Sequence, residues 1–119
     1  KFAGTDIGMN ILVRPSLYGS WHDCEILRDG SVVTGDKEEI TITGNICESG
    51  DIIADKRMLP EIKTGDLIAV LDAGAYGYSM ASNYNCRLRP AEVLIKDDGS
   101  VELIRKRDTF EDLFKGFDI

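Results

Sequence analysis

The chain has 119 residues, with 14 Lys+Arg against 21 Asp+Glu and a formal net charge of −7. Its 43% hydrophobic and 29% charged residues are typical of a folded globular protein, and the length suits one domain. The acidic balance predicts no nucleic-acid partner, because phosphate binding requires a basic surface. The longest aliphatic run, Leu67–Leu71, falls far short of the roughly 20 residues of a membrane span, so no membrane partner is expected.

The first residues and the cysteines indicate the setting of the chain. Lys1 is followed directly by Phe-Ala-Gly-Thr-Asp, without an initiator Met or a polar lead-in, which predicts a chain that begins within a strand of a larger protein. No basic leader with an apolar stretch occurs here, so no secretion signal is expected. Cys24, Cys47 and Cys86 form an odd set, which favours reduced thiols and a cytoplasmic location over a disulfide framework.

Two hairpins are predicted from Asp-Gly pairs between β-prone runs. Asp29-Gly30 supplies the positive φ angles that a two-residue hairpin turn requires, and the same device returns at Asp98-Gly99. Two such hairpins indicate an antiparallel sheet. The flanking runs are residues 25–27 and 31–34 for the first turn, and residues 91–96 and 101–106 for the second.

Three further strands are predicted between the hairpins. Residues 39–43 alternate polar and β-branched side chains, as a half-buried strand does. Residues 51–58 form another candidate. Residues 67–72 are almost wholly aliphatic and are therefore expected to form a central strand. The chain is thus predicted to be a single mainly-β domain, residues 1–119, of about seven strands.

Two segments have helical spacing. Asp108 and Glu111 match a capping box, so residues 108–115 are predicted to form a short helix. Its apolar face, which includes Phe110 and Phe114, is expected to dock on the sheet. Residues 75–83 contain a glycine and several polar residues, and are expected to form a helical turn at most.

Residues 8–19 carry a candidate anion-binding corner. Pro15 favours an extended conformation at Arg14, and Arg14 and Tyr18 would converge if a helical turn follows Pro15. A guanidinium beside a phenol suits a carboxylate or a phosphate, because the guanidinium fork matches two oxygens. The alternative is a surface arginine and a core tyrosine on a capped turn, with no ligand.

Two more clusters follow predicted strands. In residues 46–51 the thiol of Cys47 lies beside the carboxylate of Glu48, so Cys47 is a candidate acid or nucleophile. The alternative is a buried structural cysteine. In residues 72–85 small residues surround Tyr76, which would allow a ligand close to the backbone; the alternative is a glycine-rich turn. With one histidine and no Cys-x-x-Cys pair, no metal site is expected.

Taken together, the motifs resemble the C-terminal portion of the diaminopimelate decarboxylases, which belong to the fold-type III, alanine racemase-like pyridoxal 5'-phosphate (PLP) decarboxylases. The match keeps one order along nearly the whole chain, and Cys-Glu-Ser-Gly-Asp and Gly-Ala-Tyr-Gly are its most specific parts. Cys86, Leu88 and the apolar run 11–13 depart from the family's pattern, and they question the branch of the family. The matching segments are residues 6–10, 14–19, 46–51, 59–60, 65–67, 72–77, 82–85 and 89–94.

The resemblance implies an all-β C-terminal domain, a β-sandwich of Greek-key, barrel-like form with one short C-terminal helix. It implies that the N-terminal (β/α)8 barrel and the Schiff-base lysine for PLP lie outside these 119 residues, so that the fragment alone is expected to be inactive. The implied reaction is the decarboxylation of meso-2,6-diaminopimelate to L-lysine in lysine biosynthesis. The implied enzyme is a cytoplasmic homodimer whose active site is shared between subunits.

The resemblance also implies roles for five residues. Tyr76 is expected to reach both cofactor and substrate, and Arg14 and Tyr18 to hold the distal carboxylate of the amino-acid substrate. Glu48 is expected to pair with the distal ammonium group in the neighbouring subunit's site. Cys47 is expected to lie there near the substrate Cα, as proton donor or gatekeeper.

Other readings remain open at this point. Cys24 and Cys86 are expected to be structural, and His22 to be a turn or core residue. The enzyme could act instead on arginine, ornithine or carboxynorspermidine, although Arg14 disfavours a substrate with a purely cationic tail. A non-catalytic relative that serves as a binding or regulatory domain is the remaining alternative.

Overall fold

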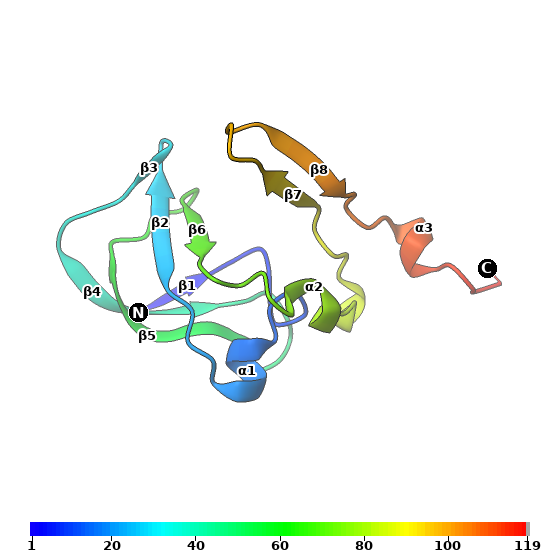
Figure 1. The fold of residues 1–119 in the computed structure, drawn as a ribbon. Coiled ribbons are helices and arrows are strands. Elements are labelled where there is room, and N and C mark those ends of the chain that lie inside the picture. Colours follow the sequence, from blue (N-terminus) through cyan, green and yellow to red (C-terminus); the bar gives the residue numbers. More distant parts are fainter. Residues whose placement is uncertain (119) are drawn as a thin grey trace. The chain divides into compact units, whose positions relative to one another are not determined.

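The computed structural model describes residues 1–118 and consists mainly of strands, with a few short helices (Figure 1). Contacts between Cα atoms divide the chain into two compact units, unit 1 (Lys1–Ala81) and unit 2 (from Ser82 onward). Residues 1–118 form eight strands, one more than the sequence predicts. No helix within these residues is long and apolar enough to cross a membrane.

Unit 1 contains two three-stranded sheets. One has the order β1-β4-β5, in which β1 is parallel to β4 and β4 is antiparallel to β5; the other has the order β3-β2-β6 and is antiparallel throughout. The two sheets share one core, which confirms the prediction of a mainly-β fold. The strands are β1 (Phe2–Gly4), β2 (Cys24–Arg28), β3 (Ser31–Val32), β4 (Lys37–Thr43), β5 (Ile52–Pro60) and β6 (Leu67–Val70). The buried core side chains are Ile26, Ile40, Ile42, Ile53, Ala54 and Leu59.

The first predicted hairpin is present, but the predicted central strand is not. β2 and β3 pair across Asp29-Gly30, whose residues both have positive φ angles. β6, however, pairs only with β2 in the described part of the chain and lies at the edge of its sheet, where Leu67 is 70% exposed. The central strand is β2, which contributes the buried Ile26. An aliphatic run shows that a strand is apolar, and it does not reveal how many neighbours that strand has.

A β-bulge interrupts the pairing of β4 with β5. The register shifts between residues 40 and 42, so that Thr41 faces two residues of β5, Asp55 and Lys56. The Thr41 hydroxyl donates to Asp55 Oδ1 (2.9 Å) and accepts from the Lys56 N–H (3.0 Å). Lys56 adopts a left-handed φ of 46°. Residues 40–42 are therefore all buried, in place of the predicted alternation.

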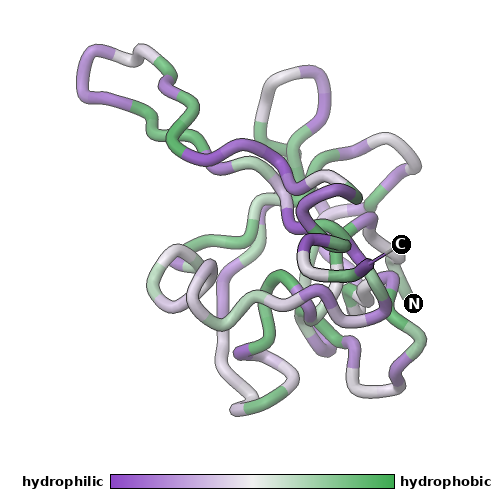
Figure 2. Tube along the Cα trace, turned by 90° about the vertical axis from the view of Figure 1, so that its right-hand side faces the viewer, coloured by the Kyte–Doolittle hydropathy of each residue, from purple (hydrophilic) through white to green (hydrophobic). Residues whose placement is uncertain are grey.

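Unit 2 contains the second predicted hairpin, formed by β7 (Glu92–Ile95) and β8 (Val101–Arg105). Its turn is longer than the predicted two residues. The Lys96 N–H donates to the Ser100 carbonyl (2.9 Å), so residues 97–99 lie between the paired residues, and Gly99 has a positive φ of 80°. The strands are largely hydrophobic and the tip is hydrophilic (Figure 2). The exposed apolar side chains of this hairpin are Val93, Leu94, Ile95, Val101, Leu103 and Ile104.

The predicted C-terminal helix is shorter than expected and has a different cap. α3 (Phe110–Leu113) is capped by Thr109 in a capping box with Asp112, because Asp108 is engaged elsewhere. The Asp108 carboxylate accepts from Arg89 and Arg105; burial alone would raise the pKa of Asp108, but the guanidinium groups lower it to about 2. α3 buries none of its residues, and its expected docking on the sheet stays a prediction. The other helices are α1 (Arg14–Tyr18), α2 (Gly77–Met80) and the short 3₁₀ helix η1 (Tyr84–Cys86).

An ion pair joins β2 to the turn before β6. Arg28 donates from Nε and Nη2 to the two carboxylate oxygens of Asp66, at 2.8 and 2.7 Å, and the Lys63 N–H donates to Asp66 Oδ2 at 2.7 Å. These bonds favour the charged form of the carboxyl group. Hydrogen bonding to Arg28, and next to Lys63, lowers the pKa of Asp66 from 3.8 to about 2.

The ion pair makes the stability of the fold sensitive to acid. Because the pKa of Asp66 is lower in the folded chain than in the unfolded chain, its stabilisation is complete above about pH 4 and is lost as the pH falls toward about 2. Asp66→Asn is expected to lower the unfolding free energy at neutral pH and to flatten its pH dependence in that window. Urea unfolding at several pH values measures this, with the exposed Asp36→Asn as control. An unaltered pH dependence in Asp66→Asn would contradict the assignment.

Candidate functional site

Helix α1 brings Arg14 and Tyr18 together, as their spacing predicts. Arg14 Cζ lies 5.6 Å from the centroid of the Tyr18 ring. Arg14 is the first residue of the helix, so the expectation of an extended Arg14 is wrong. Pro15 falls in the first turn, where a helix does not need its N–H. Gly19, at φ 63°, ends the helix and donates its N–H to the Pro15 carbonyl (2.9 Å).

Tyr76 joins this pair from the loop that follows β6. Its ring centroid lies 5.4 Å from Arg14 Cζ. Tyr76 has a left-handed φ of 64°, which is rare for an aromatic residue. Its carbonyl accepts from the Met80 N–H (3.0 Å) and from Ser79 Oγ (3.3 Å), so α2 maintains this conformation. Backbone strain of this kind costs on the order of 1–3 kcal/mol and occurs most often at functional sites.

We call Arg14, Tyr18 and Tyr76 the anion corner. Both rings are exposed, with 65% of Tyr76 accessible, so the alternative of a core tyrosine at position 18 is wrong. Within residues 1–118 no carboxylate forms an ion pair with Arg14. Its two-pronged donor group and the two phenols can therefore bind a carboxylate from outside the chain.

The loop between β4 and β5, residues 44–51, presents Cys47 and Glu48 to solvent. The loop is closed by the Gly44 N–H, which donates to the Asp51 carbonyl (2.9 Å). Glu48 Oε1 accepts from the Gly50 N–H (3.2 Å) and keeps its other oxygen available. Because Cys47 is exposed, the alternative of a buried structural cysteine is wrong. We call these residues the Cys47–Glu48 loop.

Asp51 organises this loop, and sequence reasoning missed its role. It is 4% exposed, and its carboxylate accepts from the Met9 N–H (2.6 Å) and the Ile46 N–H (2.7 Å). The carboxylate also occupies the space where Gly8 and Gly44 would carry a Cβ; at Gly8 that atom would lie 2.7 Å from Asp51 Oδ2. Gly8 and Gly44 were the sequence signal from which this role of Asp51 could have been found. Asp51 thus ties the segment before α1 to the Cys47–Glu48 loop.

This close packing predicts different outcomes for two glycine substitutions. Gly44→Ala is expected to lower the unfolding free energy by about 2 kcal/mol, because its methyl group would displace the Asp51 carboxylate from its N–H donors. Gly4→Ala is the matched control, since no atom lies within 4 Å of the added Cβ. Urea unfolding compares the two variants. Equal stability would show that the Asp51 carboxylate does not need this space.

The structure does not bring the two clusters of one chain together. Across residues 1–118, no hydrogen bond, ion pair or ring contact joins Cys47 or Glu48 to the anion corner. One chain therefore presents the anion corner and the Cys47–Glu48 loop as separate clusters.

The remaining cysteines and the histidine have different surroundings. His22 is buried, with Nδ1 3.0 Å from the Leu71 carbonyl, which confirms a core position. Cys24 is half-buried against the core, and burial raises the pKa of its thiol. Cys86 is exposed and has a left-handed φ of 56°, and its expected structural role stays a prediction. In the part of the chain that the structure describes, no three His, Cys, Asp or Glu residues gather as metal ligands.

Comparison with known proteins identifies the family. Residues 1–74 match the model of the pyridoxal-dependent decarboxylase C-terminal sheet domain. The chain is 50% identical over 116 residues to diaminopimelate decarboxylase of Methanothermobacter thermautotrophicus, covering 98% of this chain and 26% of that protein.

Solved structures agree with this match. A diaminopimelate decarboxylase structure from Methanocaldococcus jannaschii superposes with a TM-score of 0.89 at 40% identity, covering 99% of this chain and 26% of that one. A second structure of the Methanocaldococcus jannaschii enzyme, in complex with L-lysine, superposes with a TM-score of 0.85 at 41% identity. It again covers 99% of this chain and 26% of that one. The chain thus spans about a quarter of the length of the relatives it matches. Its sheets, its motifs and these matches agree, and the chain belongs to the C-terminal sheet domains of the pyridoxal-dependent decarboxylases.

Proposed function

We propose that this chain is the C-terminal domain of a cytoplasmic, homodimeric, PLP-dependent diaminopimelate decarboxylase that converts meso-2,6-diaminopimelate to L-lysine. The names of the relatives support this proposal. The N-terminal (β/α)8 barrel and the Schiff-base lysine are proposed to lie in the remainder of the intact polypeptide. The exposed apolar strands of the β7–β8 hairpin support a further domain or subunit, because large exposed apolar patches normally contact a partner.

The observation that carries the proposal is the Arg14 guanidinium between two exposed phenols, with no carboxylate partner within residues 1–118. Diaminopimelate carries a second carboxylate and a second ammonium group at its distal end. Arg14 and Tyr18 would bind this carboxylate with charge-assisted hydrogen bonds. Ornithine and arginine have only a cationic distal group, which Arg14 would repel.

The anion corner would supply part of a PLP site, because Tyr76 can contact the cofactor while the Schiff-base lysine is proposed to lie elsewhere. Tyr76 has an exposed ring and a backbone fixed by α2, so its phenol would hold cofactor and substrate in a defined orientation. PLP, when bound, would supply an electron sink for the carbanion left by the loss of CO₂.

Cys47 and Glu48 are proposed to complete the site of the second subunit. Their separation from the anion corner of the same chain and their exposure on a loop closed by backbone hydrogen bonds support this placement. Glu48 would accept hydrogen bonds from the distal ammonium group of the substrate. Cys47 would donate the proton to the substrate Cα, or exclude water from it.

A substrate panel tests the proposed specificity. The intact polypeptide, supplied with PLP, is assayed with meso-diaminopimelate, ornithine, arginine and carboxynorspermidine. We expect kcat/KM for diaminopimelate to exceed that for ornithine by about 100-fold or more, because an Arg14 guanidinium that a bound substrate covers without offering a carboxylate is costly. An equal or greater kcat/KM for any of the other three substrates would contradict the proposal.

A further inference from the structure

Arg57 is a charged residue on the inner side of β5. It is 7% exposed and pairs in register with Ile40, a core residue. Strict alternation from the buried Ala54 would turn position 57 outward, but the extra residue of the bulge turns it inward. The bulge requires a left-handed Lys56. The fold therefore adopts a strained backbone conformation at the point where it places a cation inside.

The guanidinium of Arg57 has no counterion among residues 1–118. Among the described residues no carboxylate forms an ion pair with it, and its Nε is buried without a hydrogen-bond acceptor. The Trp21 ring lies against it, with Arg57 Cζ 3.0 Å from the ring centroid. Trp21 Nε1 donates to Asp23 Oδ1 (2.8 Å), which fixes the ring. An aromatic ring covers one face of a guanidinium and leaves the N–H groups at its edge unsatisfied.

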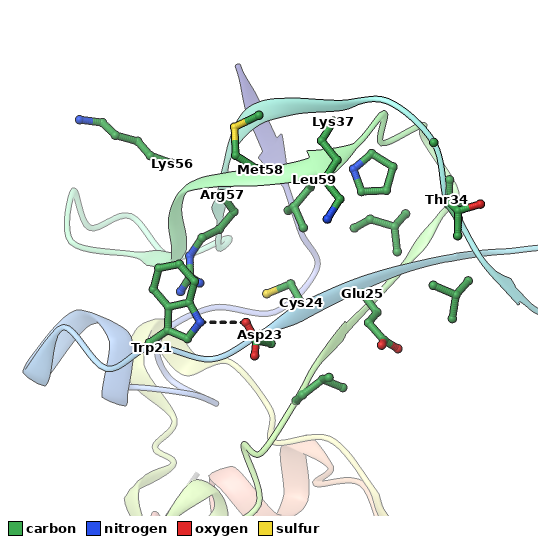
Figure 3. A pocket seen from close by; sticks show the side chains of 16 residues that line it. Trp21, Asp23, Cys24, Glu25, Thr34, Lys37, Lys56, Arg57, Met58 and Leu59 are labelled. Carbon is green, nitrogen blue, oxygen red and sulfur yellow. Dashed lines mark hydrogen bonds between the residues drawn. The ribbon is translucent and has the colours of Figure 1, made fainter.

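Arg57 and Trp21 line a cavity of about 640 Å³ in unit 1 (Figure 3). This volume is typical of pockets for small molecules. The charged groups that line it are Lys37, Lys56, Arg57, Asp23 and Glu25, three cations against two carboxylates. The remaining lining is mostly apolar and includes Ile26, Val32, Val33, Met58, Leu59 and Leu71. Of these charged groups only Arg57 is buried, so the charge that the apolar lining encloses is positive, which favours a monoanion with a hydrocarbon body.

We propose that this cavity binds a small carboxylate ligand, whose acid group pairs with the edge of the Arg57 guanidinium. The fork of two N–H groups matches the two oxygens of a carboxylate, and the aliphatic lining contacts the body of the ligand. The ligand gives the buried guanidinium the counterion that the described part of the chain does not supply. The site shares no residue with the anion corner or the Cys47–Glu48 loop, and it does not depend on the proposed enzymatic function.

Trp21 is the single tryptophan of the chain, so its fluorescence reports directly on the cavity. Titration of the 119-residue chain with sodium hexanoate is expected to change the emission of Trp21 saturably. Arg57→Lys keeps the charge but not the fork, and should weaken binding about tenfold or more. Lys63→Gln, which removes an exposed cation outside the cavity, should bind as the parent does. An unchanged emission, or equal binding of 1-hexanol or inorganic phosphate, would overturn the proposal.

A measurement on the unmutated chain avoids any effect of Arg57→Lys on folding. In ¹H–¹⁵N spectra, the Nε–H signal of Arg57 is expected to shift with hexanoate concentration, with the same dissociation constant as the fluorescence change. An Arg57 signal that does not move at saturation would overturn the proposal. The titration is repeated with the intact polypeptide. If only the 119-residue chain responds, a side chain of the intact polypeptide fills the cavity and the assignment to a free ligand is wrong.

Discussion

Replacing Arg14 by Met in the intact polypeptide is expected to raise KM for diaminopimelate by about 100-fold, which corresponds to about 2.7 kcal/mol. Arg14 lies 5.6 and 5.4 Å from the centroids of two exposed phenol rings and has no carboxylate partner in the described residues. Its proposed role is to bind the distal carboxylate, which takes no part in the bond that breaks. The loss should therefore fall on KM more than on kcat.

Two further variants sharpen this prediction. Arg14→Lys keeps the charge without the two-pronged geometry, and its KM should fall between those of the parent and Arg14→Met. Arg107→Met removes an exposed arginine outside the corner and should leave KM unchanged. A parental KM in Arg14→Met would show that the anion corner does not bind the substrate.

The second large effect is expected on mixing two inactive variants. Arg14→Met and Glu48→Gln should each lose most of the activity at substrate concentrations well below the parental KM. After subunit exchange in a 1:1 mixture, about a quarter of the parental activity should return. About half of the dimers are then hybrids, and one of the two sites in each hybrid has both Arg14 and Glu48. This follows if the anion corner of one subunit meets the Cys47–Glu48 loop of the other.

The matched control for this experiment pairs two residues of the same corner. A mixture of Arg14→Met with Tyr76→Phe should regain no activity, because every hybrid site then lacks one of the two groups. No recovery of activity in the first mixture after complete subunit exchange would place Arg14 and Glu48 in the site of one subunit. Subunit exchange is verified by mass-labelled chains.

The sequence predicted those parts of the fold that depend on local chemistry. Asp29-Gly30 and Asp98-Gly99 mark real hairpins, because few residues tolerate positive φ angles. The spacing of Arg14 and Tyr18 likewise predicted a contact along one helical turn. Tertiary interactions decided the rest. Asp108 was predicted as a helix cap, but the arginines 89 and 105 bind its carboxylate and leave the cap to Thr109.

The clusters that we propose to carry function could be predicted from the sequence, whereas the residues that support them could not. Cys47 and Glu48 were predicted from the pairing of a thiol with a carboxylate, but the role of Asp51 depends on backbone N–H groups far apart in the chain. The inward position of Arg57 depends on a bulge, which shifts the alternation by one residue. Such a shift leaves no signature in side-chain periodicity. Sequence periodicity therefore predicts Arg57 on the wrong face of its strand.

The release of CO₂ from meso-diaminopimelate by the intact polypeptide, supplied with PLP, tests the central claim most directly. The account predicts one L-lysine for each CO₂ released, and no release from the 119-residue chain alone under the same conditions. An intact polypeptide that binds PLP but releases no CO₂ from diaminopimelate would contradict the proposed function. Release of CO₂ by the 119-residue chain alone would contradict its assignment as one domain of a larger enzyme.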